Sequence, residues 1–121
     1  MKTTYDDILH TIELYRKGWQ GKPEYFEQAF DSNALIYFID AANKRHNYLL
    51  QDCFDGWSRT NWALEFELLN VDIVGEIATV KLIFKNISAP QSSFLDIHSL
   101  MKIDGHWKIV NKLATHYPQA S

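Results

Sequence analysis

The chain has 121 residues, 14% of them aromatic, and a net charge of −3 with acidic and basic residues interspersed. The length fits a single domain over residues 1–121, and the mixed charge argues against a nucleic-acid partner, whose phosphates would need a basic face. A lone cysteine excludes an internal disulfide, and no apolar run approaches the ~20 residues that span a bilayer, so we expect a cytoplasmic protein that does not bind a membrane.

Three helices are predicted in the first half of the chain. Apolar side chains of residues 3–19 recur at helical spacing and fall on one face: Ile8, Ile12, Tyr15 and Trp19. A second, short helix starts near Pro23, because proline is favoured in the first helical turn, and a third spans residues 48–57. Each helix then has an apolar face to bury against another layer.

The first strands are predicted from the spacing of apolar residues. Residues 34–39 form a continuous apolar run, which predicts a strand buried on both faces, and the polar residues 40–47 predict a loop. From Trp62 the apolar period changes to two, and after a turn at Gly75 it continues in residues 77–87. This change of period marks the start of a sheet.

The last part of the chain predicts a hairpin. Asp104-Gly105 joins two mostly apolar strands, residues 94–103 and 106–113, and Asp-Gly is typical of a tight hairpin turn. Helices followed by consecutive strands indicate an α+β fold, with three N-terminal helices packed on a strongly curved, mainly antiparallel sheet. Such a sheet curls around its helices and can form a cone with a pocket.

Three polar side chains, Asp96, His98 and Asn111, interrupt the hairpin strands. With a two-residue turn, His98 lies opposite Asn111 and Asp96 lies opposite Leu113, all on the pocket side. Opposed side chains lie about 4.5–5.5 Å apart at Cβ. A carboxylate beside an imidazole on an apolar wall suits acid/base catalysis or the anchoring of a polar ligand group.

A different turn would reverse these faces. If the loop has three residues with a bulge at Gly105, the register moves by one residue. Asp96 then faces Lys112 and His98 faces Val110 on the outer side, where they suit solvent or a dimer interface. The remaining apolar residues form a cleaner pattern in this register. The sequence therefore leaves the direction of Asp96 and His98 open.

Aromatic side chains predict the walls of a pocket, although they also suit ordinary core packing. The candidates for contact with a small-molecule ligand, beside Asn111, are Tyr15, Trp19, Tyr37, Trp57 and Trp62. The histidines lack zinc-site spacing with an acid nearby, and the chain has no glycine-rich phosphate loop. We therefore expect no metal and no cofactor.

Four stretches carry a family resemblance: Tyr15–Gly18, Phe30–Ala34, Val71–Ala78 and Asp96–Lys112. Together with the order of elements, they resemble the nuclear transport factor two-like superfamily, which includes ketosteroid isomerases and polyketide cyclases. Within it, the chain is most similar to small bacterial proteins labelled "putative lumazine-binding". The resemblance implies a cystatin-like cone, a pocket between sheet and helices, and a homodimer that pairs through the outer sheet face.

The resemblance does not carry over a complete catalytic set. The aspartate base of the ketosteroid isomerases corresponds to a position near Phe38, with Asp40 two residues on. Their strand aspartate falls near Ser99, whereas their helix tyrosine has a near match in Tyr15. That proton-transfer mechanism is therefore poorly supported.

Three functions agree with the sequence. The favoured one is a domain that binds an apolar or aromatic small molecule. The second is an acid/base enzyme of the isomerase, dehydratase or cyclase type that uses His98 and Asp96. The third is a dimeric interaction module with a filled core. Fold alone does not choose among them.

Overall fold

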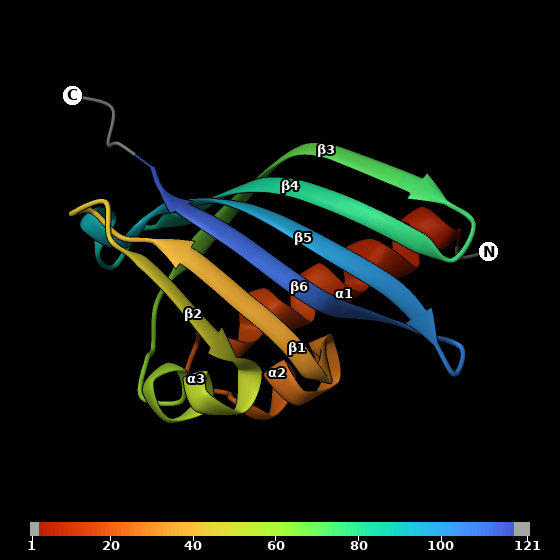
Figure 1. The fold of residues 1–121 in the computed structure, drawn as a ribbon, viewed down its shortest axis with the longest axis horizontal. Coiled ribbons are helices and arrows are strands. Elements are labelled where there is room, and N and C mark those ends of the chain that lie inside the picture. The colour runs from red at the N-terminus through yellow and green to blue at the C-terminus, as the bar shows by residue number, and fades with distance from the viewer. Residues whose placement is uncertain (1–2, 118–121) are drawn as a thin grey trace.

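The computed structural model describes residues 3–117, which fold into three α-helices and a six-stranded sheet (Figure 1). The helices are α1 (Thr4–Gly18), α2 (Glu24–Ala29) and α3 (Leu50–Trp57), with a short 3-10 helix η1 (Pro90–Ser92). The strands are β1 (Phe30–Ile39), β2 (Arg45–Leu49), β3 (Leu64–Val74), β4 (Ile77–Asn86), β5 (Phe94–Ile103) and β6 (His106–His116).

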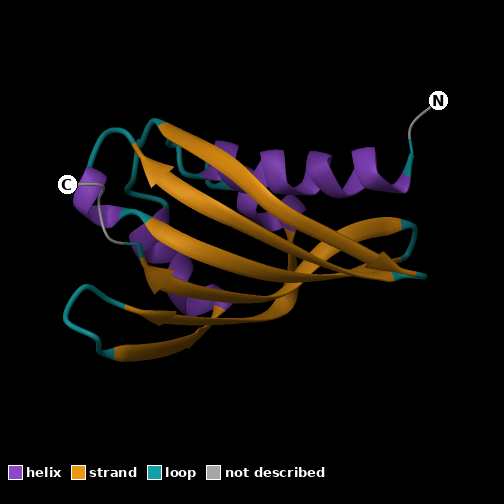
Figure 2. Ribbon diagram, turned by 90° about the horizontal axis from the view of Figure 1, so that it is seen from above, coloured by secondary structure: helices purple, strands orange, loops and turns teal. Residues whose placement is uncertain are grey.

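The strands lie in the order β2-β1-β6-β5-β4-β3, and every neighbouring pair is antiparallel except β1 and β6. The sheet is strongly curved, and the helices cover its inner face (Figure 2). The predicted α+β class, with three helices packed on a mainly antiparallel curved sheet, is confirmed. No helix within residues 3–117 has the length and apolar character needed to cross a membrane.

Helix α1 agrees closely with the prediction for residues 3–19. Thr3 and Asp6 form a capping box, in which the Thr3 side chain accepts from the Asp6 amide and the Asp6 carboxylate accepts from the Thr3 amide. Ile8, Ile12 and Tyr15 are buried against the sheet, as the apolar spacing requires. The helix therefore brings the Tyr15 hydroxyl into the core.

The prediction for residues 34–57 is wrong in two respects. Strand β1 is not buried on both faces, because Leu35 and Tyr37 are 40% and 42% exposed on the outer face. Residues 45–49, expected as loop and helix, form β2, and α3 begins only at Leu50. The turn between β1 and β2 is stabilised by Asp40, whose carboxylate accepts hydrogen bonds from the backbone amides of Ala42 and Lys44. Strand β2 lies at the edge of the sheet and buries neither face, so its sequence lacks the alternation of apolar and polar residues that predicts a strand.

The β5–β6 turn has two residues, and the alternative with a bulge at Gly105 is wrong. Asp104 and Gly105 have φ values of 50° and 82°, and Ile103 pairs with His106. Positive φ at both turn residues matches the twist of the flanking strands. Beyond this turn, the Trp107 side chain faces inward.

An extra residue in β6 then changes the register. Leu100 pairs with Ile109, but Ser99 pairs with Asn111, so Val110 has no partner opposite it in β5. Such a bulge shifts the faces of the residues beyond it. His98 consequently lies opposite Lys112, rather than opposite Asn111.

Candidate ligand-binding site

A polar cluster of Tyr15, Asp96 and His98 lies between α1 and β5, and all three side chains are completely buried. The Tyr15 hydroxyl donates to Oδ2 of Asp96 at 3.1 Å, and Nε2 of His98 lies 3.1 Å from the same oxygen. The Tyr15 and His98 rings meet edge to face, with centroids 4.8 Å apart. The bulge thus leaves Asp96 and His98 on the inner face, as the two-residue turn predicted.

Burial determines the charge states in this cluster. It raises the pKa of Tyr15 well above its usual range, with the Asp96 carboxylate adding to the effect. Burial also lowers the pKa of His98, although the hydrogen bond to Asp96 opposes the shift. We therefore assign a neutral imidazole that donates from Nε2 to Asp96, and not an ion pair.

Two polar atoms of the cluster have no hydrogen-bond partner within residues 3–117: Oδ1 of Asp96 and Nδ1 of His98. Unpaired buried polar atoms are costly and rare in folded proteins. Their presence marks this part of the core as more than apolar packing.

Beside this cluster, an inner cavity of about 240 Å³ lies between the helices and the sheet. Its walls are mainly aromatic, and its lining includes Trp19, Phe38, Trp57, Trp62, Phe84 and Phe94. The Trp19 ring stacks on Trp62, with centroids 5.3 Å apart, and lies 4.7 Å from Trp57. The backbone amide of Trp62 donates to the carbonyl of Trp19 at 2.8 Å. The end of α1 and the loop after α3 are therefore joined at the cavity.

Lys112 brings a basic group into this aromatic surface. It lines the inner cavity and is only 6% exposed. Its Nζ lies 5.0 Å from the ring centroid of Trp57, 5.5 Å from Tyr15 and 6.0 Å from Phe84. Within residues 3–117 it forms no hydrogen bond and no ion pair. Burial lowers its pKa, and the Asp96 carboxylate partly opposes this effect.

Three of the predicted ligand contacts, Trp19, Trp57 and Trp62, line the inner cavity. Tyr15 lies in the adjoining polar cluster. Two predictions of position are wrong: Tyr37 is exposed on the outer face, and the bulge places Asn111 outside the inner cavity. Asp96 and His98 point inward, but neither belongs to the residues that line the inner cavity.

Sequence reasoning missed Lys112 as a pocket residue. In the two-residue register without a bulge, Lys112 falls on the outer face. The extra residue Val110 reverses that, and the strand composition gives no signal for it. The cross-strand neighbours of a lysine can be assigned only after the register is known.

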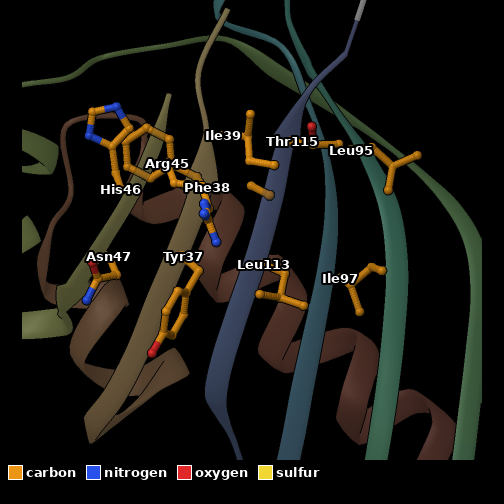
Figure 3. A pocket seen from close by; sticks show the side chains of 11 residues that line it. Tyr37, Phe38, Ile39, Arg45, His46, Asn47, Leu95, Ile97, Leu113 and Thr115 are labelled. Carbon is orange, nitrogen blue, oxygen red and sulfur yellow. The ribbon is translucent and has the colours of Figure 1, made fainter. Parts of the chain in front are cut away.

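A second hollow, of about 480 Å³, lies on the outer sheet face near the β1–β2 hairpin (Figure 3). Its lining includes Tyr37, Arg45, Asn47, Leu95, Ile97 and Leu113. We regard this outer hollow as the weaker ligand site although it is larger. Tyr37 and Leu113 are 42% and 46% exposed there, and the described residues that line it include no buried charged side chain like Lys112. Among residues 3–117, no group of three or more histidine, cysteine or acidic side chains is placed to hold a metal ion.

Solved structures show the same fold. An NTF2-like protein of unknown function from Shewanella baltica OS155 matches with a TM-score of 0.83 and 25% identity over 98% of this chain and 100% of its own. One from Silicibacter pomeroyi DSS-3 matches with a TM-score of 0.80 and 17% identity over 96% and 100%. A Nostoc punctiforme domain described as having a cystatin-like fold matches with a TM-score of 0.73 and 19% identity over 98% and 81%.

The fold therefore places the chain among the NTF2-like proteins, as the resemblance implied. A family model described as "Putative lumazine-binding" matches residues 3–114, and the chain belongs to that family. The comparison with curated proteins gave no match.

Proposed function

We propose that this protein binds a small aromatic molecule in the inner cavity and that an acceptor atom of the ligand accepts a hydrogen bond from the Lys112 amine. The observation that carries this proposal is a buried lysine whose amine lies over the rings of an aromatic cavity and has no hydrogen-bond or ion-pair partner within residues 3–117. Lysine is almost never fully buried unless it is paired. A ligand oxygen would supply the missing hydrogen bond.

The size of the inner cavity supports a compact ligand. An apolar cavity of about 150 Å³ holds one benzene molecule. A cavity of 240 Å³ has room for a substituted or bicyclic ring system. The indole rings of Trp57 and Trp62 offer flat surfaces for such a ring, and aromatic pairs in offset or edge contact are favourable by about 0.5–1.5 kcal/mol beyond area burial.

Acid/base catalysis by His98 and Asp96 is less well supported than binding. A general base must lie within hydrogen-bond reach of the substrate, directly or through one water. Neither side chain lines the inner cavity, and both are completely buried behind it. We propose instead that they position Tyr15, whose ring lies beside the Lys112 amine.

Calorimetric titration with naphthalen-2-ylmethanol tests the proposal, because this probe combines a bicyclic ring with one acceptor oxygen. We expect saturable binding and a rise in the thermal unfolding midpoint with probe concentration. Ser92 lines the inner cavity and not the outer hollow, so Ser92→Leu should fill the space and abolish binding while the fold is kept.

Tyr37→Ala is the matched control, since it alters the outer hollow and leaves the inner cavity intact. It should bind the probe like the unmodified chain. If Tyr37→Ala loses binding and Ser92→Leu keeps it, the ligand site is the outer hollow and the proposal is wrong. No heat and no midpoint shift with the unmodified chain would also contradict it.

A further inference from the structure

Lys112 differs from the other lysines in what surrounds its amine. Lysine side chains usually bury their methylene stem and keep the amine in water. Here the amine ends among the rings of Tyr15, Trp19, Trp57 and Phe84, at 5.0–6.0 Å from their centroids. Desolvation lowers the pKa of this amine, so a larger fraction of Lys112 than of an exposed lysine is in the neutral, nucleophilic form.

We propose that Lys112 forms a reversible imine with the carbonyl carbon of an aromatic aldehyde or ketone in the inner cavity, an inference that rests on the binding function proposed above. A lysine desolvated in an apolar pocket is a recognised way to activate an amine for this chemistry. The aromatic walls select a flat, conjugated carbonyl compound.

The reaction balances without an oxidant or a reductant. The lone pair of Nζ forms a bond to the carbonyl carbon, and the carbonyl π electrons move to oxygen. One proton passes from nitrogen to that oxygen, giving a carbinolamine. The carbon–oxygen bond then breaks, the oxygen leaves as water with the second nitrogen proton, and a carbon–nitrogen double bond forms. Addition of water reverses each step.

Other groups near Lys112 are poorly placed to compete. The Cys53 thiol is buried, and burial raises its pKa to about 11, so it is not a thiolate at neutral pH. The Thr60 hydroxyl donates to the backbone carbonyls of Trp19 and Trp57. His98, opposite Lys112 on β5, is neutral and does not line the inner cavity. Among the described residues that line the inner cavity, Lys112 carries the only amine, and imine formation requires an amine.

Reductive trapping tests the inference. The full chain is incubated at neutral pH with 2-naphthaldehyde and cyanoborohydride, which adds hydride to the imine carbon and fixes the ligand on nitrogen. Intact mass should show one added naphthylmethyl group, and peptide mapping should place it on Lys112 ahead of the exposed lysines. Lys112→Met should lose this label, whereas Lys81→Met, which changes an exposed lysine of β4, should keep it.

The controls separate this inference from the binding function. Naphthalen-2-ylmethanol has no carbonyl and should protect Lys112 from labelling by competing for the inner cavity. If that alcohol binds but the label is spread over exposed lysines, the imine is excluded and binding stands. If the alcohol does not bind, the binding function itself fails. Lys112→Arg provides a second variant without a primary amine, and mapping of the unmodified chain decides the question even if neither variant folds.

Discussion

His98 lies directly opposite Lys112 on the inner face of the β5–β6 ladder, so two basic side chains share one buried place. Burial lowers the pKa of each, and the lysine charge lowers that of His98 further. The nearby Asp96 carboxylate opposes this effect, because it raises the pKa of both His98 and Lys112. The charge of this part of the core therefore depends on proton uptake at His98 and Lys112.

The first prediction concerns the pH dependence of stability. Because the folded pKa of His98 lies below the unfolded value of about 6.5, the unfolded chain binds more protons just below that pH. The free energy of unfolding should fall as pH drops from about 6.5 toward the folded pKa. Urea unfolding across this range should show the fall in the unmodified chain and a smaller one in His98→Gln. His106→Gln, which changes an exposed histidine, is the control and should show the same fall as the unmodified chain. If the free energy of unfolding of His98→Gln falls with pH as steeply as that of the unmodified chain, the prediction is wrong.

The second prediction is that Lys112→Met stabilises the fold. Methionine keeps the length of the side chain but needs no hydration, and replacing buried ionic groups with apolar ones is often neutral or stabilising. We expect a gain on the order of 1 kcal/mol at neutral pH. The gain should shrink as pH rises toward 10.5, because the lysine then becomes neutral also in the unfolded chain. Lys81→Met should stay within about 0.5 kcal/mol. Destabilisation by Lys112→Met alone would show that the amine has a structural partner.

The third prediction compares two helical glycines. A Cβ added at Gly18 would lie 2.5 Å from two ring carbons of the buried Phe26, whereas one added at Gly56 meets nothing within 4 Å. Gly18→Ala should lower the free energy of unfolding by about 1–2 kcal/mol, because the overpacking outweighs the helix propensity gained. Gly56→Ala should raise it by up to about 1 kcal/mol. Equal effects of the two changes in chemical denaturation would refute the proposed contact.

The fourth prediction is a homodimer that buries the outer sheet face. Leu35, Met101 and Leu113 are 40%, 44% and 46% exposed there, and exposed apolar patches of this kind mark interaction sites. An isologous pair would cover the patch of both subunits. Sedimentation should give about twice 14.1 kDa. Leu113→Glu should give the monomer, whereas Val74→Glu, at the far end of β3, should not. A monomeric unmodified chain at high micromolar concentration would refute it.

The helical spacing in α1 and the alternation in β4 were sufficient to predict which residues are buried. Ala78, Val80 and Phe84 all face the core, as their period of two requires. Strand β2 was not predicted because this edge strand is exposed at every residue except the partly buried His46, so it has no apolar face. Lys112 escaped prediction because the bulge at Val110 adds a residue without changing composition, and only the pairing with β5 reveals it.

The bulge at Val110 divides β6 into two parts, in which the alternation of inward and outward side chains is offset by one residue. Up to Ile109 the odd-numbered residues face inward, and from Lys112 onward the even-numbered ones do. Loss of Val110 would therefore yield a regular strand with the same residues inward, so β6 can change length by one residue here without turning Lys112 to the outside. Relatives whose lengths differ at this point would keep the same cavity chemistry. Alignments of them should place the gap at Val110, because a gap further along would pair inward residues with outward ones.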